Sequence, residues 1–284
     1  MSARSSTLGP AQDARHDILP ALLRKPHVLV MGVLNITPDS FSDGGEFLDP
    51  AAALAQAERL VADGADILDI GAESTRPYGA KPISADEEIA RLAPILPAIA
   101  RLGVPVSIDT MKANVAAWAL DQGAAIANDV WGLHRDPAMA KLAAERGVPV
   151  VVMHNRDEAD PAIDIMRDMA TFFERSIAIA DTAGLPRDSI VLDPGIGFGK
   201  TPEQSTIALA RLGELSRFGR PILVGASRKR FIASVSPSEP RQRIGGSLAA
   251  HLLAVQNGAR IIRAHDVFET VQALRVAAAI GDKR

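Results

Sequence analysis

The chain contains no cysteine. That absence excludes a disulfide scaffold, a thiol nucleophile, an iron–sulfur cluster and thiolate zinc sites, so any catalysis must use oxygen and nitrogen groups. No segment approaches the roughly eighteen uninterrupted apolar residues that span a bilayer, and the first residues lack the apolar core of a secretory signal. We therefore expect a cytoplasmic protein without a membrane partner.

The chain also lacks a strong charge of either sign. It has 31 basic and 34 acidic side chains, for a formal net charge of −3, and no long run of Lys and Arg. Nucleic acids and anionic membranes require a basic patch or stripe. We therefore expect no nucleic-acid partner.

What the chain does contain is an alternation of short apolar runs with longer segments of helical period. The predicted strands span residues 27–34, 65–70, 104–109, 124–130, 148–153, 189–193, 221–225 and 259–264. The predicted helices span residues 51–63, 85–102, 112–122, 137–146, 163–183, 203–218, 243–256 and 267–280. The length of 284 residues allows either two domains or one barrel of about 250 residues.

Glycine marks the junction between a predicted helix and the next strand. It occurs just before the strands at Gly64, Gly103, Gly123, Gly147, Gly184, Gly219 and Gly258. Strands that alternate with helices are parallel, and continuous apolar strands are buried on both faces. Eight such units without a linker predict an α/β protein with a single (β/α)8 barrel, the TIM barrel, over residues 26–284. Residues 1–25 lack a period and are predicted to form a flexible, irregular N-terminal extension with at most one local turn.

The predicted barrel places the residue that ends each strand at the catalytic mouth. Alternation along the third strand puts Asp109 on the face of Ser107, so it can point inward, and Asn128 shares the face of Ile126. Together with Asp193 and Lys229, these groups could hold a flat heterocycle with donor and acceptor edges. Capping of the next helix, or a salt bridge from Lys229 to either aspartate, is the simpler alternative.

Arg263 and His265 lie two residues apart at the end of the eighth strand, where phosphate sites of this fold gather. This pairing predicts an anion site, whereas Asp266 is the expected cap of the last helix. The Asn35 amide, as a hard oxygen ligand beside phosphate oxygens, suits Mg²⁺.

Two loops at this mouth are candidate lids. They span residues 35–45, with Asp43 and two terminal glycines, and 73–81, with Arg76. A separate alternative is a phosphate-binding loop, because Gly199, Lys200 and Thr201 match the end of that motif. Its first glycine is replaced by Pro194, and the segment belongs to the sixth of eight units, which speaks against it.

Taken in order, the junctions resemble the dihydropteroate synthase family of pterin-binding (β/α)8 enzymes. The motifs that carry the resemblance are MGVLNITPDSFSDGG (31–45), DIGAESTRP (69–77), SIDT (107–110), ND (128–129), LDPGIGFGK (192–200), GASRKRF (225–231) and RAHDV (263–267). The resemblance covers residues 27–280. It implies condensation of 6-hydroxymethyl-7,8-dihydropterin diphosphate with 4-aminobenzoate, with loss of diphosphate, by a homodimer that uses Mg²⁺.

The resemblance also implies roles for individual residues. It places the pterin on Asp109, Asn128, Asp193, Lys229 and Arg263. It places the diphosphate on Asn35, Arg263 and His265, with Mg²⁺ between Asn35 and the phosphates. It places aminobenzoate beside Thr75, Pro77, Phe198 and Lys229. The catalytic residues it implies are Asp43, Arg76, Asp109 and Lys229.

The implied mechanism needs no strong base. Diphosphate departs first, its charge stabilised by the metal, Arg263 and His265, and the neutral aromatic amine then attacks the resulting pterin cation. A pterin-dependent methyltransferase would share the barrel without needing a diphosphate site. A pterin-binding paralogue without turnover is the non-enzymatic alternative.

Overall fold

The computed structural model describes residues 17–37, 49–73 and 82–283. In these residues parallel strands close into a barrel in chain order, and the eighth strand pairs with the first. The strands are β1 (Leu29–Asn35), β2 (Ile67–Gly71), β3 (Val106–Asp109), β4 (Ile126–Asp129), β5 (Val150–Met153), β6 (Ile190–Asp193), β7 (Ile222–Val224) and β8 (Ala259–Ala264). The predicted (β/α)8 barrel is confirmed.

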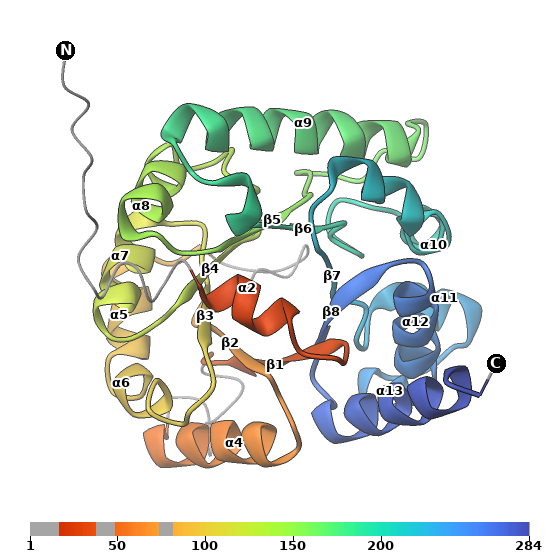
Figure 1. Ribbon diagram of the computed structural model, residues 1–284, viewed down its shortest axis with the longest axis horizontal. Coiled ribbons are helices and arrows are strands. Elements are labelled where there is room, and N and C mark those ends of the chain that lie inside the picture. The colour runs from red at the N-terminus through yellow and green to blue at the C-terminus, as the bar shows by residue number, and fades with distance from the viewer. Residues whose placement is uncertain (1–16, 38–48, 74–81, 284) are drawn as a thin grey trace.

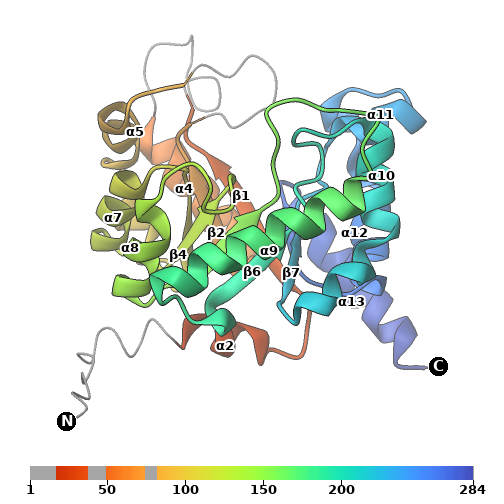
Figure 2. The same ribbon diagram turned by 90° about the horizontal axis from the view of Figure 1, so that it is seen from above.

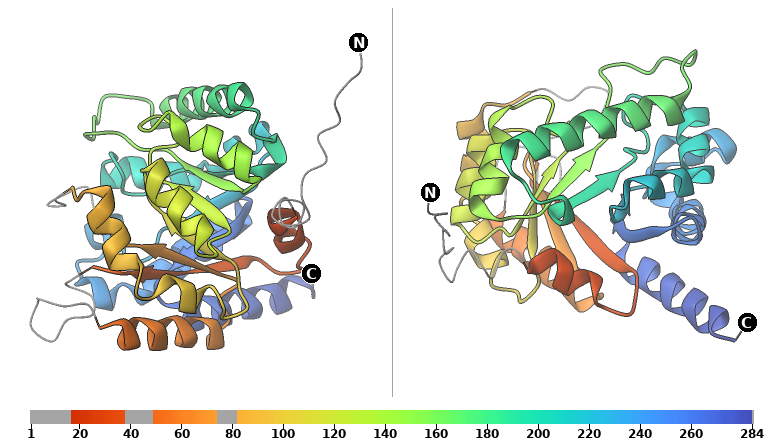
Figure 3. Two further views of the ribbon diagram at one scale, coloured as in Figure 1. Left: turned by 90° about the vertical axis from the view of Figure 1, so that its left-hand side faces the viewer. Right: turned by 45° about the horizontal axis from the view of Figure 1, so that its top comes forward.

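Helices form an outer layer around these strands (Figures 1 and 3). The α-helices are α2 (Ile18–Leu23), α4 (Pro50–Ala62), α5 (Ala85–Leu92), α6 (Leu96–Ile99), α7 (Ala113–Asp121), α8 (Ala138–Arg146), α9 (Ile165–Ala183), α10 (Pro202–Ala210), α11 (Arg230–Val235), α12 (Ile244–Gln256) and α13 (Val267–Gly281). Short 3₁₀ helices are η1 (Arg187–Ser189), η2 (Leu212–Phe218) and η3 (Pro240–Gln242). The main apolar core lies between this layer and the outward faces of the strands.

Two of the predicted helices need correction, and one helix of the outer layer was missed. The predicted helix 85–102 is two helices, α5 and α6, because Pro94 lacks the amide hydrogen that would continue α5. The predicted helix 203–218 changes to 3₁₀ geometry after α10. The short α11 was not predicted at all.

The predicted glycine at each junction between a helix and the next strand is confirmed by its backbone conformation. All seven glycines have a positive φ, from 61° at Gly219 to 106° at Gly123. Gly147 and Gly184 are the left-handed residues that end α8 and α9, a conformation in which other residues are strained.

The end of the barrel where the strands begin is closed by α2, which crosses it in Figure 1 and lies beyond it in Figure 2. Leu19 and Leu22 of α2 are buried against inward-facing strand residues such as Leu29 and Met31. Residues 18–23 of the predicted extension therefore form a helix, where the sequence indicated at most one local turn. Its residues 1–16 lie outside the described part.

Within the described ranges, no helix combines the length and the apolar character that a membrane crossing needs.

Candidate active site

A layer of polar side chains faces the inside of the barrel near the ends of the strands. It comprises Asp69, Asp109, Asn128, Asp193 and Arg263, all at most partly exposed. The predicted pleat is confirmed for β4, because Ile126 belongs to the apolar cluster inside the barrel and Asn128 lies two residues further on. Asp109 and Asn128 are register partners on neighbouring strands.

Arg263 joins two carboxylates of this layer. Its Nε donates to Asp69 Oδ2 (2.6 Å), and its Nη2 donates to Asp109 Oδ2 (2.8 Å). Asn128 Nδ2 donates to the same Asp69 oxygen at 3.1 Å. Three of the predicted pterin-binding residues thus belong to one hydrogen-bonded network.

Asp69 at the centre of this network was given no role from the sequence. It is fully buried in the middle of β2 and lies between the apolar residues Leu68 and Ile70. A carboxylate is rarely fully buried without a partner, so its position in an apolar strand was a usable signal. Its partner, Arg263, lies 194 residues away in the chain and could not be identified from local pattern.

Asp109 keeps one oxygen available. In the described part of the chain its buried Oδ1 has no hydrogen-bond partner. Burial raises the pKa of Asp109 to about 7; Arg263 and Lys229 act against this rise, and the nearby Asp69 adds to it. A buried acceptor without a donor is costly, so the geometry suits a ligand N–H group at this oxygen.

Asp193, Lys229 and Phe198 form the adjacent side of the mouth. Asp193 Oδ1 accepts a hydrogen bond from the Gly195 amide (2.7 Å), and burial raises the pKa of Asp193 to about 6. The Lys229 ammonium lies 4.0 Å from the centre of the Phe198 ring, a cation–π contact. Lys229 also opposes the pKa rise of both Asp193 and Asp109, so its charge faces the same space.

The anion side lies at the ends of β7 and β8. The His265 amide donates to Ser227 Oγ (3.2 Å), and its Nδ1 lies 3.0 Å from the same oxygen. Burial, with the charge of Arg263, lowers the pKa of His265 to about 3, so the imidazole is neutral at pH 7. His265 can therefore offer an anion a neutral hydrogen bond, while the positive charge comes from Arg263 and Lys229.

Asp266 does not act as the expected cap. It occupies the position before α13, but its side chain makes no capping hydrogen bond. It accepts instead from Arg228 Nε (3.0 Å), so this ion pair ties the segment after β7 to the segment after β8.

Asn35 ends β1 and is partly buried, opposite Gly71 of β2. Among the described residues no group of three His, Cys, Asp or Glu side chains could hold a metal ion by itself. A single amide oxygen fits Mg²⁺ that keeps most of its waters and takes further ligands from phosphate. The predicted residues Asp43, Thr75, Arg76 and Pro77 lie outside the described residues.

The phosphate-loop alternative is wrong. Lys200 is buried, and its ammonium donates to the carbonyl oxygens of Gly195 (2.9 Å) and Phe198 (3.1 Å) rather than facing the mouth. The Thr201 side chain accepts a hydrogen bond from the Gln204 backbone amide, and the Gln204 side chain accepts one from the Thr201 amide, so the two residues form a capping box at the start of α10. The segment also follows a strand of the closed barrel instead of a separate open sheet.

Known proteins place this arrangement in a family. The sequence profile of the family described as "Pterin binding enzyme" matches residues 31–265. The dihydropteroate synthase of Bacillus subtilis is 46% identical over 93% of this chain and 92% of its own length. A solved dihydropteroate synthase from Clostridium difficile, in the presence of pteroic acid, superposes with a TM-score of 0.86 at 44% identity, over 90% of this chain and 97% of that one. The enzyme of Xanthomonas albilineans with 4-aminobenzoic acid gives 0.86 at 43% identity, over 91% and 94%. The chain therefore belongs to the pterin-binding enzyme family and, within it, to the dihydropteroate synthases.

Proposed function

We propose that the mouth of this barrel condenses 6-hydroxymethyl-7,8-dihydropterin diphosphate with 4-aminobenzoate, forming 7,8-dihydropteroate and diphosphate. The observation that carries the assignment of the pocket is Asp109 Oδ1, a buried acceptor without a partner in the described residues, beside Arg263. Relatives that cover nearly the whole chain support the reaction.

The pterin is proposed to lie on the polar layer. Its amino and ring N–H groups would donate to the carboxylates of Asp109 and Asp193, because charged acceptors orient paired donors strongly. Asn128 supplies an amide next to Asp109. Lys229 and Arg263 would face the ring acceptors and balance the negative charge of the layer.

The diphosphate is proposed to bind where β1, β7 and β8 end, at Asn35, Arg263 and His265. Arg263 contributes charge, and the neutral His265 contributes a donor. Asn35 would hold Mg²⁺ together with phosphate oxygens and water. When bound, that ion would neutralise charge on the diphosphate.

Aminobenzoate is proposed to bind beside Phe198 and Lys229, with Thr75 and Pro77 on the loop after β2. The C–O bond to diphosphate breaks, Asp109 stabilises the pterin cation, and the amine nitrogen forms the new C–N bond and releases a proton to water. An aromatic amine is neutral at pH 7, so no activating base is required. Asp43 and Arg76 are proposed to assist from the two loops, on the strength of the sequence match alone.

The deciding experiment is diphosphate release by the purified chain with Mg²⁺. We expect rapid release with both substrates, slow release with the pterin substrate alone and none with aminobenzoate alone. A methyltransferase would release no diphosphate, and a binder without turnover would retain pterin affinity in calorimetry while releasing none.

A homodimer is proposed as the working form. Large apolar side chains are exposed on the last two α-helices, at Leu253 of α12 and at Phe268, Val276 and Ile280 of α13. Light scattering should give twice the chain mass of 30.0 kDa. Phe268→Glu should lower that mass, whereas Val235→Glu on the exposed end of α11 should not. The expected cytoplasmic location stays a prediction.

A further inference from the structure

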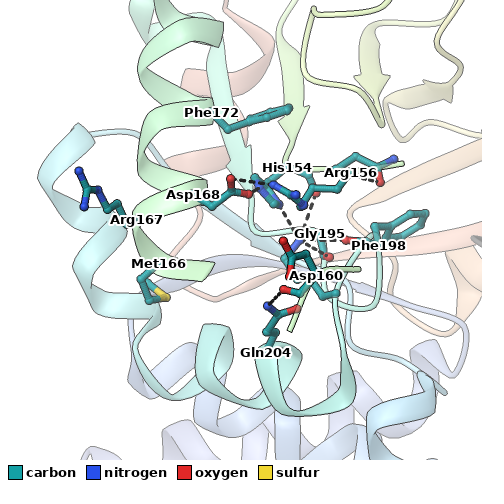
Figure 4. A network of polar contacts seen from close by, with 12 residues as sticks. His154, Arg156, Asp160, Met166, Arg167, Asp168, Phe172, Gly195, Phe198 and Gln204 are labelled. Atoms are coloured by element: carbon teal, nitrogen blue, oxygen red, sulfur yellow. Dashed lines mark hydrogen bonds and ion pairs between the residues drawn. The ribbon is translucent and has the colours of Figure 1, made fainter. Parts of the chain in front are cut away.

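A second polar network lies behind the mouth, and none of its charged side chains is a proposed substrate contact (Figure 4). It connects α9 with the segment after β5 and the loop after β6. His154 is fully buried, and its Nε2 lies 2.9 Å from Asp168 Oδ2 on α9. Arg156 Nη1 donates to the other oxygen of Asp168 at 2.8 Å.

Lys200 is the buried end of this network. Its ammonium has three acceptors within 3.1 Å, His154 Nδ1 (2.6 Å) and the carbonyl oxygens of Gly195 (2.9 Å) and Phe198 (3.1 Å), and the His154 carbonyl oxygen lies farther away at 3.4 Å. An ammonium has three hydrogens, so the three closer contacts use all of them. The arrangement also assigns the His154 tautomer: Nδ1 accepts from Lys200, and Nε2–H donates to Asp168.

The loop from Gly195 to Gly199, which accepts hydrogen bonds from Lys200, packs in close contact with residues 154–156. A Cβ on Gly195 would lie 2.0 Å from the His154 carbonyl oxygen, and one on Gly199 would lie 2.5 Å from Arg156 Cβ. Both glycines also have positive φ, 62° and 53°. The backbone from Gly195 to Gly199 is therefore fixed against residues 154–156, and Phe198 lies within it.

We infer that Lys200 is a positioning residue for the aminobenzoate side of the site. Lys200 holds the Phe198 carbonyl, and thereby the Phe198 ring against the Lys229 ammonium. His154 and Asp168 fix Lys200 from behind, so α9 sets the position of that wall. This role rests on the proposed aminobenzoate contact of Phe198.

The inference predicts a selective effect on one substrate. Lys200→Met keeps a similar chain length but removes every donor, so the Phe198 loop loses its anchor. We expect the KM for aminobenzoate to rise about tenfold, the cost of roughly one hydrogen bond to a charged group, with the Kd for the pterin substrate within about twofold.

Lys200→Met leaves buried carbonyl oxygens without donors and could prevent folding, so a second, milder variant is needed. Asp168 is partly exposed, and Asp168→Asn removes the charge that orients His154 and Arg156. We expect a rise of about threefold in the KM for aminobenzoate, in the same direction. The matched control is Arg167→Gln, one residue away on α9, whose side chain is exposed and points away from the network (Figure 4).

The pH profile supplies an independent readout. Burial lowers the pKa of Lys200 to about 7, and the charged groups that face it are Asp193 and Asp168, which raise it, and Lys229 and Arg156, which lower it further. A neutral amine has one donor fewer, so the wild-type KM for aminobenzoate should rise between pH 7 and 9. Lys200→Met should show no such rise.

The outcomes separate the two proposals. A wild-type chain that releases no diphosphate with both substrates overturns the proposed function. An active wild type whose folded Lys200→Met and Asp168→Asn variants keep the wild-type KM for aminobenzoate overturns the positioning role. Equal losses of affinity for both substrates also overturn it, because they indicate general loosening of the fold.

Discussion

The inside of this barrel has two layers of opposite character. The layer near the strand starts is apolar, formed by Leu29, Met31, Ile67, Ile126, Val151, Val191, Leu223 and Ile261, and α2 covers it. The layer near the strand ends carries three aspartates, one asparagine and one arginine. On β2, β4, β6 and β8, which contribute to both layers, the two side chains are two residues apart, or roughly 7 Å.

The difference indicates that the lower layer contributes mainly to folding stability and the upper layer mainly to the chemistry of the site. The lower layer is apolar apart from the buried Ser107 hydroxyl of β3, which has no hydrogen-bond partner among the described residues, and its apolar burial favours folding. The upper layer buries three carboxylates against Arg263, and burial raises the pKa of both Asp109 and Asp193. Buried ionic groups of this kind contribute little net stability. The proposed ligand binding accounts for the upper layer, so variants in each layer should have opposite signatures.

The largest expected effect on stability comes from the lower layer. Leu223→Ala removes a fully buried side chain and leaves a cavity, so urea unfolding should show a loss of about 2–5 kcal/mol in the free energy of unfolding. At 25 °C, kcat/KM should stay within about threefold of the wild type. As a control, Val235→Ala, at a side chain 78% exposed, should change stability by less than about 0.5 kcal/mol. A large loss of activity with unchanged stability would contradict the division between layers.

The corresponding change in the upper layer is Asp109→Asn. We expect the Kd for the pterin substrate, measured by calorimetry, to rise about 10–100-fold, because a hydrogen bond to a charged group contributes about 1.5–3 kcal/mol. Stability at pH 8 should not fall, since the raised pKa means that the folded state disfavours this charge. Asp157→Asn, at an exposed carboxylate, is the control. Full pterin affinity in the Asp109 variant would show that the pocket assignment is wrong.

The sequence predicts the local features of both layers but not the contacts between distant segments. Strand positions, the inward direction of Asp109 and the glycine junctions follow from local periodicity, and the structure confirms them. The contacts of Asp69 with Asn128 and Arg263 join strands 59 and 194 residues apart, so no local pattern reveals them. Helix α2 was missed for the same reason, because Leu19 and Leu22 are ordered by packing on distant strands.

The smallest effect, and the most direct test of the charge on the upper layer, is the pH dependence of pterin binding. An acceptor for N–H groups must be ionised, and burial raises the pKa of Asp109 from 3.8 to about 7. Affinity should therefore rise about threefold from pH 6.5 to 7.5, following the ionised fraction, and level off above pH 8.

Over pH 4–7 the stability contributed by Asp109 should fall as pH rises, because the unfolded carboxyl loses its proton first. Asp109→Asn should flatten both profiles, whereas Leu223→Ala should shift the stability curve downward without changing its slope. A wild-type affinity that is constant across this range would mean that the Asp109 charge does not meet the ligand, leaving Asp193 as the acceptor to test next.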